Sequence, residues 1–133
     1  MNNLVTIGEA ANITGLSAKM IRHYEVTGLI PKAIRSDAQY RLYNGHQLKL
    51  LGVIKQAKIL GFSLSQIRAL SDLWQNPNRA SREVKRLAEE NLHEIENKIS
   101  ELKKMKKSLQ ELADNCNDDE HSQCSILDGL DQV

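Results

Sequence analysis

Apolar residues between positions 81 and 113 recur at alternating steps of four and three, which predicts one long helix with a coiled-coil seam. The repeat runs through Ala88, Leu92, Ile95, Ile99, Leu102, Leu109 and Leu112, and Lys106 stands where a further apolar residue is due. Such a helix is roughly 50 Å long, and its narrow apolar stripe needs a partner. An intramolecular hairpin would need a second helix of similar length, which the sequence lacks, so the pattern favours dimerisation.

Two short amphipathic segments near the N-terminus predict a pair of helices joined by a tight turn. Thr6 and Glu9 fit a capping box that opens a helix to about Ile13, and Ser17 is suited to cap a second helix that Gly28 ends. This spacing fits a helix-turn-helix, and it also fits an ordinary helical hairpin. The second helix is expected to expose polar side chains suited to a DNA major groove, which favours the first alternative: Lys19, Arg22, His23 and Tyr24.

The helical period stops between Ile34 and Tyr43, where turn-forming residues are followed by strand-forming ones. This pattern predicts a small β-hairpin, or wing. Arg35, Tyr40 and Arg41 would place two guanidinium groups and a phenol on it, a set suited to backbone phosphates. A hairpin that only faces solvent is the alternative, and the neighbouring helix pair favours the DNA contact.

Two further helices are predicted before the long one. The first runs from Asn44 to Leu60 and is stopped by Gly61, and the second opens with a capping box at Ser63 and ends before Pro77. Their apolar faces are expected to complete one compact helical domain.

Composition limits the chain to one modest core, because 133 residues are 41% hydrophobic and only 4% aromatic. Residues 1–62 carry eight basic against three acidic side chains, whereas residues 114–133 carry six acidic side chains and no basic one. A basic front end suits phosphate binding, and an acidic tail belongs away from DNA. No stretch reads as a signal peptide or membrane span, so we expect a cytoplasmic protein. The sequence contains no recognisable pairing of a nucleophile with a general base, so we do not expect an enzyme.

The two cysteines, Cys116 and Cys124, lie in the acidic tail with seven residues between them. Cytosolic thiols are normally reduced, so metal ligation or redox chemistry is favoured over a structural disulfide. The spacing allows two thiolates on opposite sides of one soft ion such as Cu(I), Ag(I) or Au(I). His121 and its acidic neighbours keep a zinc site open as an alternative. A thiol-based metal buffer or redox protein is the alternative from another functional class.

The ordered segments ITGLSAKMIRHYEVTGLIP, RSDAQYRLY and GFSLSQIRAL, followed by the coiled-coil helix, resemble the MerR family of transcription regulators. The ending CNDDEHSQC and Ser81 resemble its copper-efflux regulator (CueR) branch. The resemblance implies a mainly α fold: a winged helix-turn-helix head (residues 1–77), a dimerisation helix in an antiparallel coiled coil (78–113), and a metal-binding loop with a C-terminal turn of helix (114–133).

The resemblance also implies roles for particular residues. Arg22 and Tyr24 match recognition-helix positions of the family, and the wing residues Arg35, Tyr40 and Arg41 match positions that grip DNA. Serine at position 81 stands where divalent-metal sensors carry a cysteine, which implies that no third thiolate is present. The partners implied are promoter DNA, a second copy of the chain and RNA polymerase. The family usually has glycine where this chain has Gln39, which puts the turn of the wing in question.

Overall fold

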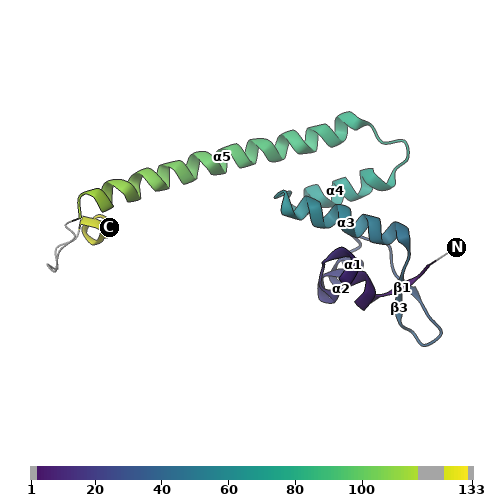
Figure 1. Ribbon diagram of the computed structural model, residues 1–133. Coiled ribbons are helices and arrows are strands. Elements are labelled where there is room, and N and C mark those ends of the chain that lie inside the picture. Colours follow the sequence, from purple (N-terminus) through teal and green to yellow (C-terminus); the bar gives the residue numbers. More distant parts are fainter. Residues whose placement is uncertain (1–2, 117–124, 132–133) are drawn as a thin grey trace. The chain divides into compact units, whose positions relative to one another are not determined.

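The computed structural model of the chain describes residues 3–116 and 125–131 and is mainly helical (Figure 1). The elements follow in the order β1 (Val5–Thr6), α1 (Ile7–Thr14), α2 (Ala18–Val26), β2 (Ile34–Arg35), β3 (Arg41–Tyr43), α3 (Gly45–Ile59), α4 (Leu64–Gln75), α5 (Ser81–Asp114) and α6 (Ser125–Leu130). The chain divides into two compact units, residues 1–88 and 89–133. None of the helices in the described ranges combines the length and apolar character of a membrane span.

Local capping explains where α1 and α2 begin and end. The Thr6 hydroxyl oxygen accepts a hydrogen bond from the Glu9 N–H, and the Ser17 hydroxyl oxygen accepts one from the Met20 N–H. Gly15 ends α1 with φ 76°, a left-handed conformation that glycine adopts without steric cost. The predicted helix pair and its turn are therefore confirmed.

The sheet is antiparallel with strand order β1-β3-β2. Strands β2 and β3 form the predicted wing, with Arg35 directly opposite Arg41. Strand β1 was not predicted, because two residues ahead of a helix cap carry no alternating pattern. It pairs with β3 through Val5 and Tyr43, so the wing is attached to the start of the helix pair.

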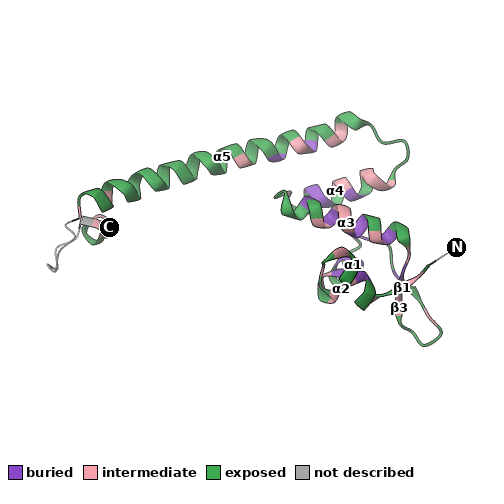
Figure 2. Ribbon diagram, in the orientation of Figure 1, coloured by how far each residue is buried: buried purple, intermediate pink, exposed green. Residues whose placement is uncertain are grey.

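Helices α3 and α4 both start with complete capping boxes. Asn44 and Gln47 exchange side-chain-to-backbone hydrogen bonds at the start of α3, and Ser63 and Gln66 do the same at α4. The helices enclose a mostly aliphatic core, and buried residues are concentrated in α1 to α4 (Figure 2). The core residues are Ala10, Ile21, Tyr24, Leu29, Ile30, Ala33, Tyr43, Leu50, Leu51, Ile54, Ala57 and Ile67.

Two aromatic rings meet where α3 and α4 pack together. The ring centroids of His46 and Trp74 are 5.0 Å apart, with 35° between the ring planes. Trp74 is half-buried against the core, whereas His46 is exposed. The single tryptophan of the chain is therefore held within the first compact unit.

Helix α5 is continuous over 34 residues, as the heptad pattern predicts. Its apolar stripe is exposed in the single chain: Leu92, Ile99, Leu102, Met105 and Leu109 keep 46–60% of their surface accessible. Figure 2 shows most of this helix in the colour of exposed residues. Exposure of so regular a row of apolar side chains to water is unfavourable, and the free energy falls when a partner covers them.

Candidate nucleic-acid interface

Helix α2 has one buried and one exposed face, and the exposed face is basic. Lys19, Arg22 and His23 are exposed, whereas Ile21 is fully buried. The prediction that Tyr24 is also exposed is wrong, since only 4% of its surface is accessible. Residues three apart lie on the same side of a helix, so Tyr24 follows Ile21 into the core. This burial leaves Tyr24 almost no surface for a DNA contact.

The tip of the wing is closed by a network around Ser36. The Ser36 N–H donates to the Tyr40 carbonyl oxygen at 2.9 Å, and its hydroxyl oxygen accepts from the Tyr40 N–H at 3.0 Å. Arg35 Nη1 donates to the Gln39 carbonyl oxygen at 3.0 Å. These bonds hold Gln39 at φ 65°, a conformation that costs a non-glycine residue roughly 1–2 kcal/mol. The turn therefore forms without a glycine at position 39, and Tyr40 remains exposed at its tip.

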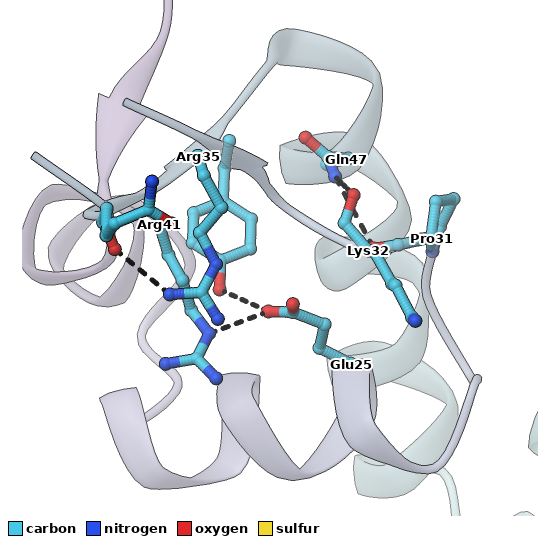
Figure 3. Close-up of polar contacts among 8 residues, drawn as sticks. Glu25, Pro31, Lys32, Arg35, Arg41 and Gln47 are labelled. Carbon is cyan, nitrogen blue, oxygen red and sulfur yellow. Dashed lines mark hydrogen bonds and ion pairs between the residues drawn. The ribbon is translucent and has the colours of Figure 1, made fainter. Parts of the chain in front are cut away.

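A buried carboxylate links α2 to the wing (Figure 3). Glu25 Oε2 accepts hydrogen bonds from Arg41 Nε at 3.1 Å and from the Tyr43 hydroxyl at 3.0 Å. Arg41 and Tyr43 are two apart on β3, so both side chains leave the strand on the same face. The Glu25 side chain is 8% exposed and that of Arg41 is 27% exposed. This pair is therefore better shielded from water than a surface salt bridge.

The sequence analysis did not identify Glu25 or Tyr43 as residues of this site. One signal was available for Glu25, because it is an acidic residue on an otherwise basic helix. Sequence reasoning also missed the tertiary contacts of Gln47, whose side-chain amide lies 3.5 and 3.4 Å from the carbonyl oxygens of Pro31 and Lys32 (Figure 3). Ser71 on α4 donates to the Leu29 carbonyl oxygen at 3.0 Å. The segment between α2 and the wing is therefore attached to both α3 and α4.

Burial raises the pKa of the Tyr43 phenol from 10.0 to about 12, together with the hydrogen bond to Glu25 and the negative charge of that carboxylate. The positive charges of Arg41 and Arg22 act in the opposite direction. The folded protein thus keeps a proton that the unfolded chain releases above pH 10. The resulting stabilisation is fully present below pH 10 and is lost as the pH rises towards 12.

We therefore expect the free energy of unfolding to fall between pH 10 and 12 by an amount on the order of 2 kcal/mol. Urea unfolding followed by circular dichroism over this range measures it. Tyr43→Phe should remove most of this dependence, whereas Tyr40→Phe, which removes an exposed phenol, should retain it. An unchanged pH dependence in Tyr43→Phe would contradict the assignment.

The predicted metal ligands are only partly described. Cys116 follows the end of α5, is half-buried, and its N–H donates to the Ala113 carbonyl oxygen at 3.2 Å. Cys124 and His121 lie outside the described residues. Within residues 3–116 and 125–131, no group of three or more histidine, cysteine or acidic residues is placed to hold a metal ion.

The segments on either side of the predicted loop are helical. Ser81 is exposed and is the first residue of α5. The predicted C-terminal turn of helix is present as α6, and Gly129 lies so close to α5 that an added Cβ would overlap the Leu112 side chain. Helix α6 therefore packs closely against the end of α5 at Gly129.

Comparison with known proteins gives concordant matches along the chain. Residues 5–73 match the model described as MerR HTH family regulatory protein, and residues 48–112 match the model described as MerR, DNA binding. The chain is 40% identical over 126 residues to heavy metal-dependent transcription regulator 2 of Rhizobium meliloti, covering 95% of this chain and 86% of that protein. It is 39% identical to the transcriptional regulator CueR of Salmonella typhimurium, covering 95% and 91%.

A solved structure agrees with the fold. The crystal structure of the transcription regulator PbrR691 from Ralstonia metallidurans in complex with lead(II) superposes with a TM-score of 0.82 at 28% identity. The match covers 95% of this chain and 98% of that one, so the likeness extends from the helix pair through the long helix.

Proposed function

The chain belongs to the MerR family of helix-turn-helix transcription regulators, and we propose that it is a metal-responsive member that binds promoter DNA as a homodimer and senses a monovalent coinage metal ion. As a member of this family it is a DNA-binding regulator and not an enzyme. The single observation that carries the proposal is the basic face of α2 joined to the wing by Glu25.

We assign DNA contacts to side chains on two elements. Lys19 and Arg22 on α2 are suited to base edges and phosphates of a major groove, because both are exposed cations on the face opposite Ile21. The wing contributes cations and a phenol for the adjoining phosphates, namely Arg35, Tyr40 and Arg41. Tyr24 is not included, because it is buried.

The dimer proposal rests on the exposed apolar stripe of α5. An antiparallel coiled coil would cover this stripe with the same stripe of a second copy. A dimer also presents two α2 helices to DNA, and helix-turn-helix dimers read paired half-sites. Dimerisation and operator recognition are therefore linked.

The metal proposal rests on the donor set. Two soft thiolates, Cys116 and Cys124, suit Cu(I), Ag(I) or Au(I), each of which is stable with few sulfur ligands. The relatives named as a heavy metal-dependent regulator and as CueR support a metal effector. Serine at position 81 supplies no third thiolate for a divalent ion. The zinc alternative requires His121 as an additional ligand.

We propose that the regulator occupies its promoter with and without metal, repressing transcription in one state and activating RNA polymerase in the other. Activation would bend and untwist the promoter, a deformation costing on the order of a few kcal/mol. A ligand shifts an equilibrium only by its differential affinity for the two states, so the metal must favour the distorting conformer by a comparable amount.

The proposal is tested with a DNA duplex that the wild-type protein selects from a random-sequence library. For transcription, this duplex is cloned between the two polymerase recognition elements of a promoter. Gel-shift titration measures binding, and in vitro transcription with added Cu(I), Ag(I) or Zn(II) measures the response. Binding together with activation by Cu(I) or Ag(I) supports the proposal. Metal binding without DNA binding would instead favour a metal buffer, and activation by Zn(II) alone would favour a divalent sensor.

Arg41→Ala should weaken binding to all duplex sequences and lower the slope of log affinity against log salt by about one unit, because one phosphate contact is lost. Arg82→Ala on α5 removes the same charge outside the wing and should leave the slope unchanged. Binding titrations at several salt concentrations measure both slopes, and thermal melts confirm that both variants fold. An unchanged slope in Arg41→Ala would show that Arg41 does not contact a DNA phosphate.

A further inference from the structure

Beyond these contacts, we propose that Glu25 is a positioning residue for DNA binding: it orients the guanidinium of Arg41 so that the terminal nitrogens of Arg41 face a DNA phosphate. The inference rests on the proposed function, and it assigns a role to an acidic residue that would itself be repelled by DNA.

The hydrogen bonds of the Glu25 carboxylate fix the position of Arg41 relative to α2. Its carboxylate is on the buried side of α2 and accepts two hydrogen bonds on a single oxygen, Oε2, from side chains 16 and 18 residues further along the chain. Tyr43 is fully buried and donates one of them, so the phenol fixes where Oε2 lies. The other bond then fixes Arg41 relative to α2.

The bond to Arg41 uses only one of its three nitrogens. Glu25 accepts from Nε, and nothing else in the described part of the chain accepts a hydrogen bond from the Nη1 and Nη2 groups. A guanidinium is planar, so holding Nε sets the plane in which the remaining donors lie. Those donors form the fork that matches two oxygens of a phosphate.

The wing itself supplies a reason for the carboxylate. Arg35 and Arg41 are direct cross-strand partners, and like charges in such a position destabilise a hairpin. Figure 3 shows the carboxylate of Glu25 beside the guanidinium of Arg41, joined to it by a hydrogen bond. Arg35 is held by the Gln39 carbonyl oxygen and Arg41 by Glu25, so each cation has its own acceptor. The negative charge of Glu25 allows both cations to lie on one face of the wing.

The sign of the effect distinguishes positioning from overall charge. Removing a negative charge from a DNA-binding surface should by itself tighten binding. If Glu25 instead orients Arg41, its removal should weaken binding, and only while Arg41 is present. Glu25→Gln keeps the size of the side chain without its charge, and Glu25→Asp keeps the charge but withdraws the carboxylate by one methylene.

The test is a double-mutant cycle in DNA affinity at fixed salt, using a duplex selected by the wild-type protein. We expect Glu25→Gln and Glu25→Asp each to weaken binding about tenfold in the wild-type background, and less than about twofold in the Arg41→Ala background. Asp72→Asn on α4 removes an exposed carboxylate and is the matched control for the charge change. Circular dichroism melts verify folding, and Glu25→Asp carries the test if Glu25→Gln does not fold.

Equal weakening in both backgrounds would assign Glu25 a merely structural role and overturn the proposal. Tighter binding by Glu25→Gln, matching Asp72→Asn, would reduce its role to net charge and also overturn it. Failure of the wild-type protein to select or bind any duplex would instead refute the proposed function, so the two failures are distinguishable.

Discussion

Replacing Cys116 by serine is expected to abolish Cu(I)-dependent transcription while leaving DNA binding by the metal-free protein nearly intact. Each thiolate would supply half of a two-coordinate shell, and a serine hydroxyl is too hard and too weakly acidic to replace it. DNA binding should persist because Cys116 lies at the end of α5, whereas the proposed DNA contacts lie on α2 and the wing. In vitro transcription titrated with Cu(I), beside gel-shift titration, measures the two effects separately.

The same experiment with two further variants identifies the ligand set. Cys124→Ser should match Cys116→Ser, since both thiolates are required. His121→Ala should change little if two sulfurs hold the ion, and it should remove a Zn(II) response if the zinc alternative holds. Full Cu(I) activation by Cys116→Ser, or a Zn(II) response that depends on His121, would refute the two-thiolate site.

Replacing Leu102 by lysine is expected to convert the protein into monomers and to abolish binding to its operator. Leu102 lies in the middle of the exposed stripe on α5 and keeps 58% of its surface accessible in the single chain. In a coiled coil it would be covered by the partner, where an unpaired ammonium is costly to bury. Loss of the dimer then removes paired half-site recognition, which supplies most of the specific affinity.

Light scattering measures the mass of this variant, and Ser100→Lys is its matched control. Ser100 is exposed on the same helix but outside the apolar repeat, so the added charge alone should not separate the subunits. A dimer retained in Leu102→Lys would show that this stripe is not the interface. A monomer in Ser100→Lys would show that charge, rather than position in the repeat, drives dissociation.

Features fixed by neighbouring residues could be predicted from the sequence. The starts of α3 and α4 depend on residues three apart, Asn44 with Gln47 and Ser63 with Gln66, and both capping boxes are present. The long helix was predictable for a similar reason, because a heptad pattern over seven apolar positions has few alternatives. Capping residues and the apolar repeat were therefore sufficient to predict the helices and their order.

Features that depend on tertiary packing could not be predicted. Tyr24 was expected at the DNA surface, since a phenol is compatible with both a core and an interface, and only packing decides between them. The Glu25–Arg41 pair joins α2 to β3 across 16 residues of sequence, and no local pattern reports such a contact. Strand β1, which also pairs with β3, has no sequence pattern of its own. The metal ligands remain a prediction because Cys124 and His121 lie outside the described residues.

Trp74, which contacts His46 where α3 and α4 pack together, is an intrinsic fluorescent probe of one compact unit. Trp74 is the single tryptophan, so its emission reports the packing of α3 against α4, whereas far-ultraviolet circular dichroism reports all of the helices, including the 34 residues of α5. Recording both signals in one denaturant titration therefore tests, without any label, whether the packing around Trp74 is lost together with the helices. Coincident midpoints would mean that the compact unit around Trp74 and the long helix unfold together.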